Sequence, residues 1–207
     1  MYLVTGGAGF FGEKLVKHLL SMGHQVTCFD LNKPNFSHPN LKICEGDIRN
    51  IDAVRSVTIG VDKVYHNVAQ VPIAKDKQLF WSVNYDGMAN ILACSLENKV
   101  KCVVYTSSSA VFGIPSSNPI KSTTIPTPKE DYGKAKLAAE ELCNEYRQKG
   151  LSCSIVRPRT ILGTGRLGIF QILFEWIYQG RNIPVLGSGD NIYQFVHADD
   201  LANACIS

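Results

Sequence analysis

The sequence TGGAGFFG at residues 5–12 follows a short apolar run and opens a segment with helical periodicity. Its glycines Gly6, Gly9 and Gly12 are spaced three residues apart. At such a turn the first glycine permits a tight bend, the second leaves room for a pyrophosphate, and the third lets the helix pack closely on a sheet. The helix start then offers N–H groups and a positive partial charge to an anion. The stretch therefore predicts a strand–loop–helix unit that binds a dinucleotide.

An acidic residue follows the glycine turn where such a unit carries one. Asp30 ends the next apolar run, residues 25–30, about 20 residues beyond the glycines. A carboxylate there can accept hydrogen bonds from the ribose hydroxyls of the dinucleotide. It also repels a 2′-phosphate, so the sequence predicts NAD rather than NADP as the cofactor.

Strand-like and helix-like segments alternate over most of the chain. Strands rich in Val and Ile that are separated by amphipathic helices are typical of a parallel sheet covered on both faces. We therefore predict an α/β fold, a Rossmann-like doubly wound parallel sheet with helices on both faces. The expected strands are residues 2–5, 25–30, 41–45, 61–67, 101–106 and 152–157, and the expected helices are 10–22, 51–57, 79–98 and 129–149.

The alternation fades beyond Pro158. A helix is expected at residues 167–179, an extended segment at 183–186 and the beginning of another helix at 198–206, with no independent second core. We divide the chain into an NAD-binding Rossmann domain, residues 1–165, and the start of a substrate-binding region, residues 166–207. That C-terminal substrate region is expected to be incomplete, or truncated.

Composition argues against several other classes of protein. The 207 residues carry a net charge of +3 without a basic run, so nucleic acid is not an expected partner. No apolar stretch reaches the roughly 20 residues that span a bilayer, and residues 1–4 lack the basic leader of a signal peptide. The seven cysteines form no CxxC pair and have no histidine at metal-ligand spacing, which indicates reduced thiols, no metal and a cytoplasmic protein.

A series of short segments along the chain is more specific than the glycine turn alone. They are TGGAGFFG (5–12), GDI (46–48), HNVA (66–69), VNYDG (83–87), SSSAVFG (107–113), YGKAK (132–136), RP (157–158) and FVHADD (195–200). In this order and with these intervals, the set resembles the extended short-chain dehydrogenase/reductase family of NAD-dependent epimerases and dehydratases. The resemblance covers essentially the whole chain and implies an NAD-dependent enzyme, an oxidoreductase or isomerase, acting on a small-molecule substrate.

Two residues of the YGKAK segment suggest proton transfer. Tyr132 and Lys136 are four residues apart on a predicted helix and so share one face. Near a nicotinamide, a cationic Lys136 would stabilise the phenolate of Tyr132 and lower its pKa, so that Tyr132 could act as base or acid towards a substrate oxygen. The resemblance implies that Lys136 also holds the nicotinamide ribose. It further assigns Ser108, three residues before Val111, as a hydrogen-bond partner of the same oxygen, which completes the predicted catalytic set.

The cofactor contacts are predicted partly from the glycine turn and partly from the resemblance. The resemblance alone assigns Asp47 and Ile48 to the adenine, and Val68 and Ala69 to the segment that runs under the cofactor. The predicted NAD-binding residues are Gly6, Gly9, Phe10, Phe11, Gly12, Asp30, Asp47, Ile48, Val68, Ala69, Asn84, Ser107, Tyr132, Lys136 and Pro158.

The predicted reaction is hydride transfer at a secondary alcohol carbon, with a nucleotide sugar as the first substrate class. A hydroxysteroid- or dihydroflavonol-type dehydrogenase acting on a sterol-like alcohol, and a non-catalytic NAD-binding regulator, stay open as alternatives. Ser109 and Ala110 replace the acidic pair typical of sugar 4,6-dehydratases, so dehydration is not expected. Thr160 stands where similar 4-epimerases carry an asparagine, and Arg159 is similar to hydroxysteroid-dehydrogenase relatives.

Three further features carry structural expectations. His66, at the end of an apolar strand, is expected to be a packed histidine rather than a catalytic one. Asp199 and Asp200 are expected at a helix N-terminus, with an acid as the cap. The helices at residues 79–98 and 129–149 resemble those that pair relatives into dimers, so a homodimer is expected.

Overall fold

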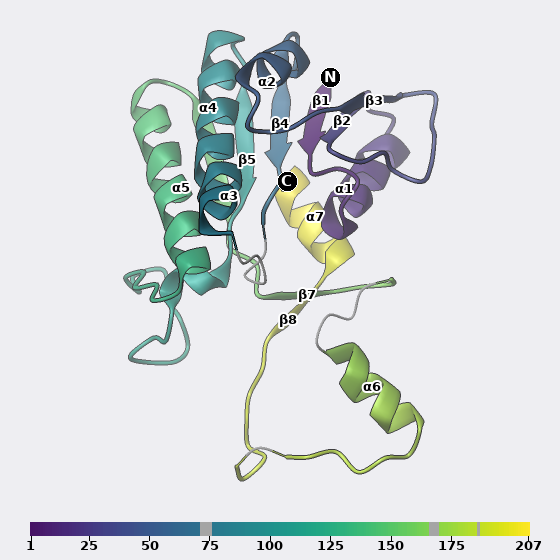
Figure 1. Cartoon of the computed structure of the whole chain (residues 1–207), viewed down its shortest axis with the longest axis vertical. Helices are drawn as coiled ribbons and strands as arrows, with labels where there is room; N and C mark the ends of the chain where they lie inside the picture. The colour runs from purple at the N-terminus through teal and green to yellow at the C-terminus, as the bar shows by residue number, and fades with distance from the viewer. Residues whose placement is uncertain (71–75, 166–169, 186) are drawn as a thin grey trace.

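The computed structural model describes residues 1–70, 76–165, 170–185 and 187–207, and its central element is a parallel β-sheet. Its six strands follow the order β3-β2-β1-β4-β5-β6 (Figure 1). The chain runs outward from β1 to β3 and then returns to the other side of β1, which confirms the predicted Rossmann-like fold. The strands are β1 (Tyr2–Thr5), β2 (Val26–Asp30), β3 (Leu41–Glu45), β4 (Lys63–His66), β5 (Cys102–Thr106) and β6 (Ser152–Val156).

Helices cover both faces of the sheet, as predicted (Figure 1). The helical segments are α1 (Phe10–Ser21), α2 (Ile51–Thr58), α3 (Lys77–Trp81), the π-helical turn η1 (Ser82–Asp86), α4 (Gly87–Glu97), the 3-10 turn η2 (Ser109–Phe112), α5 (Asp131–Gln148), α6 (Phe170–Tyr178) and α7 (Ala198–Ile206). Helices α2, α4 and α5 lie on one face, and α1 and α7 lie on the other.

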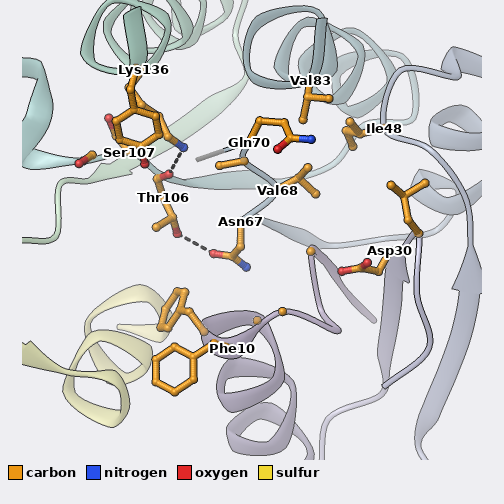
Figure 2. A pocket seen from close by; sticks show the side chains of 18 of the residues that line it. Phe10, Asp30, Ile48, Asn67, Val68, Gln70, Val83, Thr106, Ser107 and Lys136 are labelled. Carbon is orange, nitrogen blue, oxygen red and sulfur yellow. Dashed lines mark hydrogen bonds between the residues drawn. The ribbon is translucent and has the colours of Figure 1, made fainter. Parts of the chain in front are cut away.

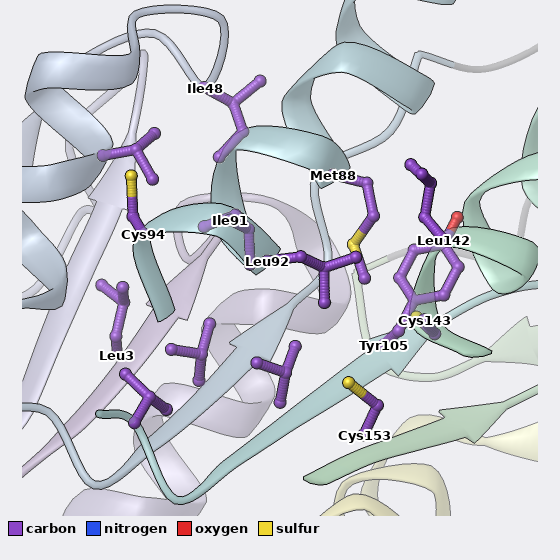
Figure 3. Packing of buried hydrophobic residues seen from close by; sticks show 14 of the residues in the cluster. Leu3, Ile48, Met88, Ile91, Leu92, Cys94, Tyr105, Leu142, Cys143 and Cys153 are labelled. Carbon is purple, nitrogen blue, oxygen red and sulfur yellow. The ribbon is translucent and has the colours of Figure 1, made fainter. Parts of the chain in front are cut away.

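The sheet has an apolar core on each side because successive strand residues point to opposite faces. In β1, Leu3 belongs to one core and Val4 to the other, and β5 divides Val103 and Val104 in the same way. Figure 3 shows the first core, in which residues of α4 and α5 pack over the sheet. The members labelled there are Leu3, Ile48, Met88, Ile91, Leu92, Cys94, Tyr105, Leu142, Cys143 and Cys153.

The long helix predicted over residues 79–98 is divided into three parts. It starts slightly earlier, at α3, because the carboxylate of Asp76 accepts hydrogen bonds from the N–H groups of Gln78 and Leu79. The wider turn η1 then connects α3 to α4. Apolar periodicity does not reveal such a turn, because it widens the helix locally without exposing the buried face.

The C-terminal part contains strands that the sequence does not predict. β7 (Thr160–Leu162) and β8 (Phe195–His197) form a two-stranded parallel sheet, too short to give a periodic signal. The helix predicted at residues 167–179 is present as α6, and residues 167–169 lie outside the described residues. The extended segment predicted at 183–186 forms no strand at 183–185, and residue 186 also lies outside them.

Helix α7 directly follows β8 in the chain and packs on the six-stranded sheet. It lies beside α1, and its Leu201 and Cys205 belong to the second core (Figure 1). The division of the chain at residue 165 stays a prediction. The helix start expected at Asp199 is confirmed, but the expected acid cap is wrong, because Nδ1 of His197 accepts the N–H of Asp199 at 3.3 Å.

Two chain-wide observations bear on the expectations from composition. Across the part of the chain that the structure describes, no helix has both the length and the apolar character needed to cross a bilayer. All seven cysteines are free thiols, five of them buried. Cys143 on α5 and Cys153 on β6 hydrogen-bond to each other inside the first core.

The packing of Gly12 gives a first prediction. A Cβ atom at Gly12 would lie 2.0 Å from the carbonyl oxygen of Gly6. Gly12→Ala should therefore lower the free energy of unfolding by about 2–3 kcal/mol, because two stretches of backbone have to separate. The matched variant Gly9→Ala puts its Cβ 3.3 Å from the same oxygen, and its cost should stay below about 1 kcal/mol. Urea unfolding measures both losses, and equal losses would contradict this role for Gly12.

Candidate active site

The main cleft opens at the carboxyl ends of β1 and β4, where the strand order reverses. Its volume of about 710 Å³ lies in the range of cofactor and substrate sites. Figure 2 shows side chains from the glycine turn, the strand ends and α5 directed into it. The predicted site residues that line the cleft are Gly6, Gly9, Phe10, Phe11, Gly12, Asp30, Asp47, Ile48, Val68, Ala69, Ser107, Ser108, Tyr132, Lys136 and Pro158.

The glycine turn forms one wall of the cleft. Gly6 has a φ of +70°, which an L side chain rarely adopts, and a Cβ there would lie 2.9 Å from the backbone nitrogen of Val68. Helix α1 begins after Gly9 without a side-chain cap, so its first turn offers N–H groups to a ligand. This wall therefore fits an anion such as a diphosphate.

Two carboxylates lie at the β2–β3 end of the cleft. Asp30 is half-buried, and its Oδ2 accepts the N–H of Ala8 at 3.1 Å, which ties the end of β2 to the glycine turn. Asp47 is paired with Arg49 at 2.5 Å, and this hydrogen bond lowers the pKa of the Asp47 carboxyl. Both acids are therefore held in place beside the region where an adenosine would lie.

Ser108, Tyr132 and Lys136 meet at the opposite end of the cleft. The ammonium of Lys136 donates to the carbonyl oxygen of Thr106 at 2.9 Å and lies 5.9 Å from the centre of the Tyr132 ring. Thr106 in turn donates its hydroxyl to Asn67 at 2.6 Å, as the dashed lines in Figure 2 show. Ser108 shares a hydrogen bond with Tyr132, so the structure brings together the three residues predicted as the catalytic set.

The pKa of Tyr132 is raised in this structure, whereas the sequence analysis expects Lys136 to lower it near a nicotinamide. Burial raises the pKa of Tyr132 above 10, although the hydrogen bond with Ser108 opposes this rise. Burial also lowers the pKa of Lys136 to about 7, with the nearby Glu140 carboxylate opposing the fall. Lys136 is thus a weaker source of positive charge than a solvated lysine, and the desolvation of the phenol dominates.

A buried carboxylate that sequence reasoning missed supports helix α5. Glu140 lies one turn after Lys136 and is only 2% exposed. It accepts the hydroxyl of Ser107 at 2.5 Å and the guanidinium of Arg157 at 2.6 Å. The hydroxyl of Ser107, a predicted cofactor contact, therefore already donates its hydrogen to Glu140. The sequence signal was the i+4 spacing of Glu140 after Lys136, but only the fold brings Ser107 and Arg157 to it.

Asn84 is the predicted site residue that does not line the cleft. Its buried amide donates to the carbonyl oxygens of Phe80 and Gln70 at 3.0 and 3.2 Å, and Gln70 itself faces the cleft. A contact between Asn84 and the cofactor therefore stays a prediction. Arg159 and Thr160, which the sequence analysis singled out for the substrate but not as site residues, also line the cleft. The other lining residues outside the predicted set are Phe29, Leu31, Gly46, Arg49, Asn67, Gln70, Leu79, Val83, Thr106 and Ile161.

His66 is a packed histidine, as expected. It is fully buried, its Nδ1 lies 2.7 Å from the hydroxyl of Thr5, and its ring stacks on Tyr105. Burial first, and then the charge of Lys136, lowers its pKa to about 3, so the ring is neutral. His66 therefore supports the strands beneath the cleft and takes no part in its lining.

This fold and this cleft agree with the comparison to known proteins. The chain matches the NAD dependent epimerase/dehydratase family over residues 2–207, and it belongs to that family. It is 59% identical to the uncharacterized protein y4nG of Sinorhizobium fredii over 99% of this chain and 52% of that protein. It is 34% identical to the 3-beta-hydroxysteroid dehydrogenase of Mycolicibacterium neoaurum, over 90% of this chain and 54% of that enzyme.

Solved structures extend the similarity to three dimensions. A UDP-glucose 4-epimerase of Thermotoga maritima, solved with UDP-glucose, is 26% identical, with a TM-score of 0.86 over 99% of this chain and 72% of that one. MoeE5, solved with UDP-glucuronic acid and NAD, is also 26% identical with a TM-score of 0.86, over 99% and 70% of the two chains. This chain spans about half the length of y4nG and of the Mycolicibacterium neoaurum enzyme.

NAD is the cofactor of this chain, and the cleft fits it. Family membership and neighbours solved with NAD agree on this point. The turn at Gly6 and Gly9 leaves an uncapped helix start for the diphosphate, and Asp30 stands at the end of β2, where a ribose would lie. Ser108 and Tyr132 line the other end of the cleft.

The burial of Lys136 makes the stability of the fold depend on pH. Its pKa is about 7 in the folded chain and 10.5 in an exposed lysine. Between these values the unfolded chain binds more protons, so stability present above pH 10.5 is lost as the pH falls toward 7. The free energy of unfolding should therefore rise from about pH 7 to about pH 9.

Urea unfolding at the two pH values tests this dependence on Lys136. In Lys136→Met, the slope of the free energy of unfolding against pH should be smaller, by an amount that corresponds to about one bound proton. The exposed Lys134, on the same helix, provides the control Lys134→Met, which should keep the full rise. An unchanged pH slope in Lys136→Met would show that this lysine is not the group responsible.

Proposed function

We propose that this protein is an NAD-dependent oxidoreductase or epimerase that transfers a hydride at a secondary alcohol carbon, with Tyr132 as acid/base. The observation that carries the proposal is the convergence of Ser108, Tyr132 and Lys136 on the cleft that the glycine turn lines. A non-catalytic NAD-binding regulator needs no proton-transfer group, so this arrangement favours an enzyme.

The proposed mechanism divides proton and hydride transfer. When bound, NAD takes up the hydride of the alcohol carbon and returns it in the reverse direction. Tyr132 takes the proton of the substrate hydroxyl as that C–H bond breaks, and gives a proton back on reduction. Ser108 holds the same oxygen. A protonated Lys136 would favour the phenolate and oppose the burial that raises the pKa of Tyr132.

For the cofactor, the proposed contacts follow the walls of the cleft. The turn from Gly6 to Gly12 binds the diphosphate, and Asp30 accepts the hydroxyls of the adenosine ribose. Asp47 and Ile48 flank the adenine. The remaining contacts are proposed for Phe10, Phe11, Val68, Ala69, Asn84, Ser107, Tyr132, Lys136 and Pro158.

A nucleotide sugar is the substrate class we propose first. The solved neighbours that hold UDP-glucose and UDP-glucuronic acid support it. A hydroxysteroid-type alcohol is the second candidate, favoured by the 34% identity to a 3-beta-hydroxysteroid dehydrogenase. Ser109 and Ala110 provide no acid for the elimination of water, so dehydration is not proposed. A homodimer through α4 and α5, and a cytoplasmic location, also stay predictions.

Removal of the phenol oxygen tests the proposed acid/base. Tyr132→Phe should lower the rate of NAD reduction by about 10²-fold or more, because it removes the hydroxyl that is proposed to take the proton. NAD affinity, measured by calorimetry, should be unchanged within about twofold. Tyr146→Phe, on the same helix, is the control and should keep wild-type turnover. Wild-type turnover in Tyr132→Phe would reject Tyr132 as the acid/base.

Substitution of Asp30 tests the choice of cofactor. Asp30→Asn should weaken NAD binding by about tenfold and narrow the preference for NAD over NADP, since a neutral amide no longer repels the 2′-phosphate. Asp190→Asn removes the same charge from an exposed position away from the cleft and should change neither affinity. Calorimetric titration with both dinucleotides measures this, and equal affinities for NAD and NADP in the wild type would refute the role of Asp30.

A further inference from the structure

The charged side chains that line the cleft differ in how their charges are balanced. Asp47 and Arg49 pair with each other, Asp30 accepts two backbone N–H groups, and Lys136 donates to a backbone carbonyl. Arg159 also lines the cleft, but within the described ranges no carboxylate lies at ion-pair distance from it. Its positive charge is therefore not neutralised by the protein around it.

The backbone holds Arg159 firmly at this wall. On one side, the carbonyl oxygen of Pro158 accepts the N–H of Ser109 at 3.0 Å. On the other, Thr160 begins β7, pairs with Phe195 and lies 3.0 Å from the hydroxyl of Tyr193. The backbone of Arg159 is therefore held at this wall, while its side chain is exposed.

The guanidinium of Arg159 lies against Ser109 and Tyr193 at the exposed edge of the cleft. Its Nη1 lies 3.5 Å from the hydroxyl oxygen of Ser109, and its central carbon lies 5.0 Å from the centre of the Tyr193 ring. Ser109 directly follows Ser108, whose hydroxyl bonds Tyr132. Arg159 is thus at the substrate end of the cleft, whereas the glycine turn forms the wall proposed for the cofactor diphosphate.

We propose that Arg159 binds a carboxylate that the substrate carries close to the alcohol carbon that is oxidised. This inference rests on the proposed hydride transfer at Tyr132. A planar guanidinium matches a carboxylate with two parallel hydrogen bonds. Arg159 also adds a positive charge to the cleft lining, and a negative group on the substrate would offset that charge.

The experiment compares two probes that differ only in the carboxylate. The NAD-loaded chain is titrated by calorimetry with UDP-glucuronate and with UDP-glucose. A second pair, a 3-hydroxysteroid with and without a carboxylate on the adjacent carbon, covers the other substrate class. In at least one pair, the wild type should bind the acid about tenfold more tightly than the neutral partner.

Variants separate recognition of the carboxylate from simple stacking on Tyr193. Arg159→Gln keeps a planar group but removes the charge, and it should abolish the preference for the acid while leaving the affinity for the neutral partner within about twofold. Arg159→Lys should restore part of the preference. Arg181→Gln, an exposed arginine outside the cleft, should retain all of it.

The outcomes distinguish this inference from the proposed function. Equal affinities within both pairs, a preference that survives in Arg159→Gln, or no binding of any probe to the NAD-loaded chain would overturn the role of Arg159. A preference for the acid that Arg159→Gln removes would support it, even if neither acid reduces NAD. That last result would count against hydride transfer at Tyr132 and not against the carboxylate site.

Discussion

The rest of the structure depends on the close approach of helix α1 to the turn that precedes it. There is no room for a side chain at Gly12, where a Cβ would lie 2.0 Å from the carbonyl oxygen of Gly6, and little more at Gly6. Because the backbone meets itself here, α1 starts directly above the end of β1 and its N–H groups face the cleft. The same contact fixes α1 against the sheet, so one constraint shapes both the second core and the anion-binding wall.

A buried polar layer on the other side of the cleft fixes helix α5 and the side chains of Tyr132 and Lys136 in a similar way. Lys136 is anchored to the carbonyl oxygen of Thr106, and Glu140 joins Ser107 to Arg157. These bonds connect α5 to the ends of β5 and β6, the two strands beneath it. Buried polar groups of this kind are stable only when each finds a partner, so the network determines one orientation of the helix that carries Tyr132.

Local sequence was sufficient for most of the sheet, because each strand is a short apolar run whose neighbours are dictated by the alternation with helices. It was not sufficient where structure depends on distant partners. The pairing of Thr160 with Phe195 joins segments more than thirty residues apart and leaves no periodic trace. The cap of α7 is another case, because the imidazole of His197 accepts the N–H of Asp199, whereas the sequence led us to expect an acidic cap. Glu140 was overlooked because its partners, Ser107 and Arg157, directly follow the ends of β5 and β6 and are distant in the sequence.

The candidate site shows the same limit in its electrostatics. Spacing alone placed Tyr132 and Lys136 on one face, but it treated the lysine as a full positive charge. Burial decides otherwise: it raises the pKa of Tyr132 and brings the pKa of Lys136 to about 7. The chain by itself therefore keeps the proton on the phenol. A lower pKa for Tyr132 therefore requires positive charge from a molecule bound beside it, so the chemistry of the cleft depends on what fills it as well as on its own residues.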